Sequence, residues 1–349
     1  MSTYLRRSLG AAFLALTAFG LGSCGADSTA EVATLRYGID DERNFNRLPQ
    51  VIAEREGFFA REGLNVEIVN FASSFREPAE GQTAAAADAT TVREAMDSGS
   101  IHMSRQQLPL LINDVMTGRV SGTYVGVSTP ITNSVYFLAV RPEITSFADL
   151  RGKVVTITGL HDGITVWTRE LLALHGLGKD DVELKVIAGS QARFTCLESG
   201  ECAAASLAQP AVFQALDAGY QVLGITNAVG PLFYQLDIVN PAWAAANRDA
   251  VIKYIRAITA AVAFIQDPAN RGEVVRVTMD FMQESEDRTR QMLSYVWDPA
   301  NRVLPQQPAF NLDDTRDAIA LLGKYDVLAP PLPAPERFVD PSYAAAASQ

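Results

Sequence analysis

The chain has 349 residues, of which 40 are Asp or Glu and 29 are Lys or Arg, so its formal net charge at pH 7 is −11. This acidic balance argues against a nucleic-acid partner, because affinity for phosphates comes mostly from Lys and Arg. The length is sufficient for two domains of ordinary size.

The amino terminus predicts an export signal and a lipid anchor. Arg6 and Arg7 precede an apolar run from Leu9 to Leu21 that is too short to span a bilayer comfortably. The run ends in LGSC, which resembles the lipobox at which bacterial lipoproteins are cleaved and acylated on the cysteine. We expect residues 1–23 to be the signal peptide, Cys24 to carry the lipid and residues 24–34 to form a tether. The alternative is a transmembrane anchor or an ordinary secreted protein.

Residues 54–71, EREGFFAREGLNVEIVNF, predict two short helical segments that lead into a strand. Gly57 and Gly63 can each take the left-handed conformation that ends a helix without a Cβ penalty. Apolar and polar residues then alternate from Leu64 to Ile68, which indicates a strand with one buried face. The segment is therefore expected to be an α/β connection.

From Leu35 onward, strand-like runs alternate with helical patterns, which is typical of an α/β fold with mostly parallel sheets flanked by helices. The predicted strands are LRYGI, VEIVNF, IHMS, GTYVGV, SVYFLAV, KVVTIT, VELKVI, AAASL, QVLGIT and YQLDIV. Toward the carboxyl terminus, helices are expected at residues 248–265, 273–282, 287–295 and 313–322, before a tail rich in Pro and Ala.

An internal echo predicts two similar lobes. REAMDSGSIHMS (93–104) and FTCLESGECAAAS (194–206) both have a helix end, a Ser-Gly stop and a short strand that ends on serine. Breaks at Thr129-Pro130 and Gly230-Pro231 indicate two crossings between the lobes. We expect lobe one to comprise residues 34–129 plus 230–349 and lobe two residues 130–229. Two crossings create a hinge with a cleft, and open α/β sheets bind ligands at the carboxyl ends of their strands.

The cysteines favour an oxidising compartment. With Cys24 lipidated, Cys196 and Cys202 remain as a pair that can form a disulfide, although buried free cysteines are the alternative. The three histidines, His102, His161 and His175, have no ligand-like spacing with the cysteines, so no metal site and no cofactor are expected.

Several segments in order resemble bacterial type II periplasmic solute-binding proteins, in the branch of sulfonate, nitrate and thiamine-precursor (NMT1/THI5-like) binders. They are PQVIAEREGFFAREGLNVEIVNF, SFADLRGKVVTIT, LALHGLGKDDVEL, CLESGECAAASLAQP and IVNPAW. The resemblance covers roughly residues 35–285. It implies a two-lobed clamp, monomeric and extracytoplasmic, that delivers a small molecule to an ABC permease. The ligand would be a sulfonate-like anion or a pyrimidine or other aromatic compound.

The loops that follow the strands supply the candidate ligand-binding residues. In lobe one, Arg43 (or its neighbour Arg47), Arg76 and Arg105 can converge on an anionic group, for which a planar guanidinium is well suited. Ordinary surface arginines paired with nearby acids are the alternative. In lobe two, Asp162 is expected to cap a helix, which argues against an anion at that helix start. The full candidate set is Arg43, Asn44, Ser74, Arg76, Ser104, Arg105, Asn133, His161, Asp162, Gln191, Ser206, Gln209 and Asn227.

Two other functions stay open at this stage. The same branch includes a thiamine-pathway enzyme that carries a cysteine-rich iron motif and a sacrificial histidine, but this chain has no cluster of three cysteines. No nucleophile elbow, phosphate-binding Gly loop or HExxH motif is present either, so we expect a binding protein. A ligand-sensing lipoprotein without a transport role would use the same clamp.

The anchor can be tested by Cys24→Ser. Because the thioether that carries the lipid cannot form on serine, the variant should leave uncleaved precursor or soluble protein and should lose labelled fatty acid. A mature amino terminus elsewhere, with unchanged fractionation of the variant, would show that the lipid is not attached at Cys24.

Overall fold

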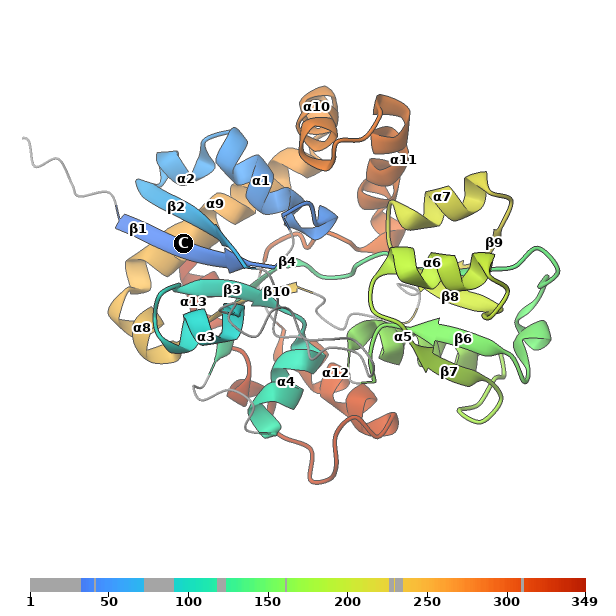
Figure 1. Ribbon diagram of the computed structural model, residues 1–349. Helices are drawn as coiled ribbons and strands as arrows, with labels where there is room; N and C mark the ends of the chain where they lie inside the picture. Colours follow the sequence, from blue (N-terminus) through green and yellow to red (C-terminus); the bar gives the residue numbers. More distant parts are fainter. Residues whose placement is uncertain are drawn as a thin grey trace, which may run out of the picture. The chain divides into compact units, whose positions relative to one another are not determined.

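Two five-stranded sheets organise the part of the chain that the computed structural model describes (Figure 1). The described residues are 33–40, 42–71, 91–117, 124–160, 162–225, 229, 235–308 and 311–349, and by their contacts they belong to one unit. The first sheet has the order β2 (Leu64–Asn70), β1 (Ala33–Ile39), β3 (Met103–Gln106), β10 (Gln235–Val239), β4 (Val125–Ile131). The second has the order β7 (Glu183–Val186), β6 (Val154–Ile157), β8 (Ala204–Leu207), β5 (Phe137–Val140), β9 (Gln221–Ile225).

The sheets are mixed, with one reversed strand each. β1 pairs in parallel with β2 and β3, whereas β10 runs antiparallel to its neighbours β3 and β4. In the second sheet, β6 pairs in parallel with β7 and β8, and β5 is the antiparallel strand between β8 and β9. The other four strands of each sheet share one direction, as the sequence pattern predicted, and each predicted strand overlaps an observed one.

In both sheets the four strands that share one direction lie in the order second, first, third, fourth along the chain, with the reversed strand between the third and the fourth, and the echoed segments occupy matching places. The reversed strand comes last along the chain in the first sheet (β10) and first in the second (β5). The first echoed segment forms α3 (Val92–Asp97) with β3, and the second forms α6 (Ser190–Glu198) with β8. In each sheet this strand is the third, along the chain, of the four strands that share one direction. The stop between helix and strand is a glycine with positive φ in both, 71° at Gly99 and 78° at Gly200. The repeated sequence phrase therefore corresponds to a repeated structural unit.

The predicted break at Thr129-Pro130 does not end a strand. β4 continues through Pro130 to Ile131. β4 is the last strand in its sheet's order, and an edge strand tolerates a residue without an N–H because one side lacks ladder partners. The second predicted break, Gly230-Pro231, lies outside the described residues, as do the signal segment and Cys24. The domain limits at residues 129/130 and 229/230 stay a prediction.

The glycines of the opening α/β connection behave as the sequence predicted. α1 (Leu48–Arg55) and α2 (Phe58–Arg61) are separated by Gly57 with φ 71°, and Gly63, with φ 65°, precedes β2. A Cβ at either glycine would meet no atom within 4 Å, so the constraint is the backbone conformation alone. The two glycines are part of the scaffold.

The remaining helices cover the sheets (Figure 1). α9 (Arg248–Gln266), the longest, packs on α1 and α2 and places residues such as Ile255, Ile258 and Val262 in the core. The others are α4 (Leu108–Met116), α5 (Gly163–Leu174), α7 (Ala211–Asp217), α8 (Pro241–Ala246), α10 (Arg271–Met282), α11 (Glu286–Trp297), α12 (Leu312–Lys324) and α13 (Ser342–Ala347). Within the described ranges, no helix has the length and apolarity that a membrane crossing requires.

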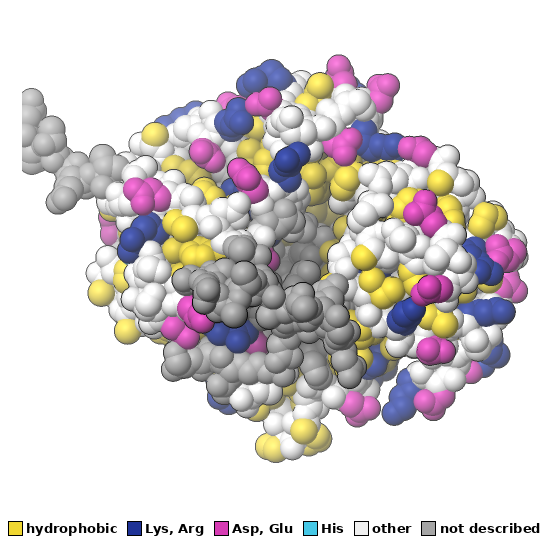
Figure 2. All heavy atoms as spheres, viewed as in Figure 1, with side chains coloured by type: hydrophobic (Ala, Val, Ile, Leu, Met, Phe, Trp, Pro, Cys, Tyr) yellow, Lys and Arg dark blue, Asp and Glu magenta, His cyan; other side chains and the backbone are white. Residues whose placement is uncertain are grey.

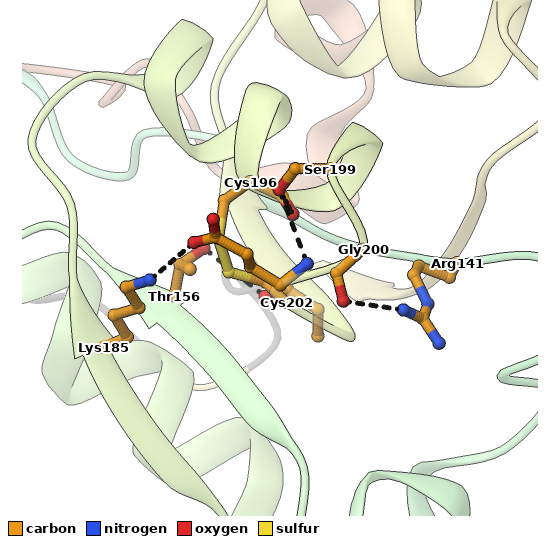
Figure 3. Close-up of a disulfide and its surroundings, with 9 residues drawn as sticks. Arg141, Thr156, Lys185, Cys196, Ser199, Gly200 and Cys202 are labelled. Carbon is orange, nitrogen blue, oxygen red and sulfur yellow. Dashed lines mark hydrogen bonds and ion pairs between the residues drawn. A yellow bond between two sulfur atoms is a disulfide. The ribbon is translucent and has the colours of Figure 1, made fainter.

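A disulfide joins the end of α6 to the start of the following strand (Figure 3). Cys196 and Cys202 are both buried, with Cα atoms 5.5 Å apart. The turn between them is also held by Cys202 N, which donates to Cys196 O at 3.2 Å, and by Arg141 Nη1, which donates to Gly200 O at 2.9 Å. The bridge fixes α6 against β8.

A buried carboxylate ties the returning strand β10 into the first sheet. Asp237 has no exposed surface, and its Oδ1 accepts from the hydroxyls of Tyr37 on β1 at 2.7 Å and Tyr254 on α9 at 3.2 Å. Its Oδ2 accepts from Ser128 on β4. Burial raises the pKa of Asp237 to about 6, an effect that the hydroxyl donors and the charge of Arg105 partly offset.

The pH dependence of stability tests this carboxylate. Because the pKa of Asp237 is higher in the folded protein than its ordinary value of 3.8, the folded state holds the proton more tightly, and this contribution to stability is present below about pH 4 and lost as pH rises through about 6. A rise of the pKa from 3.8 to about 6 corresponds to about 3 kcal/mol. Asp237→Asn, which does not titrate, should therefore gain about 3 kcal/mol of unfolding free energy relative to wild type between pH 4 and pH 7, measured by urea denaturation. If the unfolding free energies of the two proteins changed equally between pH 4 and pH 7, this prediction would be wrong.

Candidate functional site

A cavity of about 270 Å³ lies where loops from both sheets and the carboxyl-terminal helices meet. Figure 2 shows the surface hollowed at the centre of the drawn face, between the parts that carry the two sheets. The volume is near the lower end of the range for small-molecule sites, roughly 300–1,000 Å³. Its described lining is Arg43, Asn44, Phe45, Asn46, Ser134, Val135, Tyr136, Thr158, Gly189, Ser190, Arg193, Ala208, Gln209, Pro210, Met282, Val296 and Val303.

The first wall is the loop after β1, and hydrogen bonds fix its shape. Asn44 caps the short 3-10 helix Phe45–Arg47, with its Oδ1 accepting from Asn46 N at 3.0 Å. Asn46 Oδ1 accepts in turn from Ser134 Oγ at 3.1 Å, on the chain that leads from β4 to β5. The loop that follows the first strand is thus tied to the crossing, and it presents Arg43 and Asn44 to the cavity.

The second wall is built around a buried arginine on α6. Arg193 is 1% exposed, and it donates to Ser206 O at 2.6 Å, to Ile187 O at 2.9 Å and to Ser190 Oγ at 3.0 Å. These bonds connect α6 to β8 and to the chain that follows β7. Because a guanidinium stays protonated at physiological pH, they place a positive charge under the first turn of α6.

Two of the helices that begin near this wall, α5 and α6, differ at their amino ends. At α5, Asp162 Oδ1 accepts from Thr165 N at 3.0 Å, and Gln107 Oε1 accepts from Gly163 N at 3.0 Å. Asp162 is therefore the helix cap that the sequence predicted. At α6, the capping position is Gly189, with φ 82° and no side-chain cap. The first amides of α6 are thus left for another acceptor.

Three predicted site residues line the cavity: Arg43, Asn44 and Gln209. They come from the loops after β1 and β8, which lie far apart in the sequence. The cavity therefore combines residues from segments assigned to both predicted lobes. Their roles toward a ligand stay predictions.

Other predicted site residues have protein partners away from the described lining of this cavity. Ser104 Oγ donates to Gly38 O at 2.9 Å, and Arg105 pairs with Asp40 at 3.1 Å. Asn133 Nδ2 donates to Asn301 O at 3.5 Å, and the Ser206 hydroxyl lies 2.7 Å from that of Thr168.

Five positions remain to be placed. Gln191 is exposed in the first turn of α6. Ser74, Arg76, His161 and Asn227 lie outside the described residues.

The structure adds lining residues that the sequence reasoning missed. Thr158 ends the predicted strand KVVTIT, so its place at a strand end was visible in the sequence. Ser190 and Arg193 belong to the start of a helix, and their pattern alone does not distinguish a cavity wall from a surface. Met282 and Val296, from α10 and α11, are far from the site in sequence and gave no signal.

The arrangement can hold a ligand through charge, hydroxyl groups and apolar contact. The ionisable side chains among the described lining residues are Arg43, Arg193 and Tyr136. Within the described part of the chain, no group of three or more His, Cys, Asp or Glu side chains is placed to hold a metal ion.

Comparison with known proteins identifies the architecture. A family model described as NMT1/THI5 like matches residues 44–270. The aliphatic sulphonate binding protein SsuA from Escherichia coli is 15% identical, with a TM-score of 0.68 over 91% of this chain and 99% of that chain. The nitrate-binding protein NrtA from Synechocystis PCC 6803 is 14% identical, with a TM-score of 0.67 over 91% of this chain and 89% of that chain.

An enzyme has a similar structure as well. The desulfurization enzyme DSZB is 15% identical, with a TM-score of 0.60 over 90% of this chain and 99% of that chain. No curated protein matches the sequence. At these identities the solved structures establish the two-lobed periplasmic-binding-protein fold, and the fold hosts both binding proteins and an enzyme.

Proposed function

Because the chain belongs to the NMT1/THI5-like family, we propose that it is the solute-binding component of an ABC importer and captures a small organic molecule in the cavity between its two sheets. The observation that carries the proposal is the cavity itself. Its walls come from the loop after β1, the crossing from β4 to β5, and the segments that follow β6 and β8. Ligands of open α/β sheets bind at such strand ends.

Several features support an extracytoplasmic location and a lipid anchor. The disulfide between Cys196 and Cys202 suits an oxidising compartment. The lipobox-like LGSC segment would attach the protein to the membrane through Cys24. Two proteins of similar structure are named as a periplasmic sulphonate-binding protein and a periplasmic nitrate-binding protein. We propose a monomer that docks to an ABC permease.

Binding is proposed in preference to catalysis. The described lining pairs two arginines with hydroxyl, amide and apolar side chains, which suits recognition of a small polar or anionic compound. An enzyme of this fold stays the alternative because DSZB shares the architecture. Turnover of a ligand by the isolated protein would favour that alternative.

A ligand panel tests the proposal. The panel comprises sulfonates, nitrate, pyrimidines and aromatic carboxylates, and the measurement is the thermal unfolding midpoint against ligand concentration. A compound that binds only the folded state at 100 times its Kd stabilises by about 2.7 kcal/mol, so the midpoint should rise with the logarithm of concentration. If no member raises the midpoint, the proposal is wrong for these ligand classes.

Arginine variants then locate the ligand. Arg43→Ala should weaken binding of an anionic member about tenfold, on the order of 1.4 kcal/mol, because Arg43 lines the cavity. Arg55→Ala is the matched control, since Arg55 is half exposed and pairs with Asp280 on the surface. Arg105→Ala should mainly lower stability, because Arg105 pairs with Asp40. Equal affinities of the Arg43 and Arg55 variants would remove Arg43 from the site.

A further inference from the structure

Arg47 ends the loop that forms the first cavity wall, and its side chain is only 5% exposed. It is not among the described lining residues, whereas Arg43 and Asn44 of the same loop are. Arg47 Nη1 donates to Glu42 O at 2.6 Å, and Arg47 N donates to Asn44 O at 2.9 Å. Arg47 thus holds the carbonyl groups on both sides of Arg43.

A row of buried hydrogen bonds leads from Arg47 into the interior. Arg47 Nε donates to Gln50 Oε1 at 3.1 Å, and Gln50 Nε2 donates to the Tyr254 hydroxyl at 3.4 Å. The Tyr254 hydroxyl donates to Asp237 Oδ1 at 3.2 Å. All four side chains are buried, and hydrogen bonds in such surroundings are electrostatically stronger than in water.

The hydrogens of this row all point toward the carboxylate. A guanidinium can only donate, so the amide oxygen of Gln50 faces Arg47 and its amide nitrogen faces Tyr254. The Tyr254 hydroxyl accepts that hydrogen and gives its own to Asp237. A row of bonds that runs from a cation to an anion polarises each of its members. Arg47 and Asp237 are its two charged ends.

The start of the same loop is tied to the same region by Arg105. Arg105 lies opposite Asp237 in the pairing of β3 with β10, and its side chain pairs with Asp40, directly after β1, at 3.1 Å. Burial raises the pKa of Asp237, and the charge of Arg105 partly offsets this effect. Both ends of the loop are therefore held by arginines that belong to the surroundings of one buried carboxylate.

We infer that Arg47 is a positioning residue of the ligand site, which holds Arg43 and Asn44 at the cavity with a firmness set by the carboxylate of Asp237. Arg47 acts through the loop and does not touch the ligand. The inference rests on the proposed function only in taking the cavity as the ligand site. Because it concerns the order of the loop, it is tested without a ligand, so its failure is distinguishable from failure of the proposed function.

Ionisation of Asp237 makes this effect depend on pH. The groups that face Asp237 from the surrounding elements are Tyr37 on β1, Arg105 on β3, Ser128 on β4 and Tyr254 on α9. Because its pKa is about 6, the carboxylate loses its charge as pH falls through that value. Hydrogen bonds to an ionised acceptor are roughly twice as strong as neutral ones, so protonation should loosen the row and the loop.

Global stability changes in the opposite direction. The raised pKa of Asp237 contributes to global stability below about pH 4, and this contribution is lost as pH rises through about 6. Looser structure of the loop at low pH would therefore report a local effect and not global unfolding.

Hydrogen exchange of the loop is the test. Asn44 Oδ1 holds Asn46 N at 3.0 Å, and Asn44 O holds Arg47 N. The protection of these two amides is measured by mass spectrometry from pH 5 to pH 8, with the intrinsic exchange rate divided out. It should fall about fivefold from pH 7 to pH 5 in wild type and should not change with pH in Asp237→Asn.

Two tyrosine variants separate the row from the carboxylate itself. Tyr37→Phe and Tyr254→Phe each remove a buried hydroxyl that donates to Asp237 Oδ1, but the row to Arg47 runs through Tyr254. At pH 7, Tyr254→Phe should lower the protection of the loop amides about fivefold. Tyr37→Phe, the matched control, should leave it near that of wild type.

Arg47→Lys tests the other end of the row. Lysine keeps the positive charge but lacks the planar fork that reaches Glu42 O and Gln50 Oε1 together, so the protection should again fall about fivefold. The reference amide is Asp313 N, which Asn311 Oδ1 holds at 2.9 Å at the start of α12. Its protection should be the same in every variant.

The inference is overturned if the loop amides of wild type are equally protected at pH 5 and pH 7, if the two tyrosine variants lose protection equally, or if Arg47→Lys keeps it. Should a variant fail to fold, the pH profile of wild type decides. In each case the ligand panel tests the proposed function separately.

Discussion

The carboxylate of Asp237 is the contact on which the two-sheet arrangement depends. The chain leaves the first sheet after β4, forms the whole second sheet and returns as β10, so the first sheet is completed only by a segment about one hundred residues further along. Asp237 sits in the middle of that returning strand and accepts from hydroxyls on β1, β4 and α9. A carboxylate without exposed surface requires such donors, because leaving it unpaired in the interior costs several kcal/mol. Its position therefore defines where the returning strand belongs.

The return of the chain to the first sheet as β10 also determines where the cavity lies. β10 lies between β3 and β4, and β5 lies between β8 and β9, so the crossings leave each sheet at matching points in its order. The loops after β1, β6 and β8 then face a common space with the β4–β5 crossing. Ser134 and Asn46 join the crossing to the first wall, and Arg193 organises the second. Separate sets of hydrogen bonds thus hold the scaffold and the two cavity walls.

Much of the fold was predictable because its signals are local. Gly57 and Gly63 mark helix ends through backbone conformation, and the repeated Ser-Gly stop marks the two equivalent helix–strand units. Pro130 was misleading as the end of a strand, because whether a proline ends a strand depends on its place at the sheet edge. The cavity was only partly predictable: Arg43, Asn44 and Gln209 follow strands, whereas Met282 and Val296 approach from helices far along the chain. The amino end of α6 is uncapped because Gly189 has no side chain, and the sequence pattern alone did not show that the helix begins directly after this glycine.

The central claim is that one cavity, walled by both sheets, holds the ligand. The most direct measurement is a crystal structure of the protein with the tightest-binding compound of the ligand panel. The account predicts electron density for the compound between Arg43 and Asn44 on one side and Thr158 and Ser190 on the other. Density for the compound at another place, with this cavity holding only water, would contradict the account.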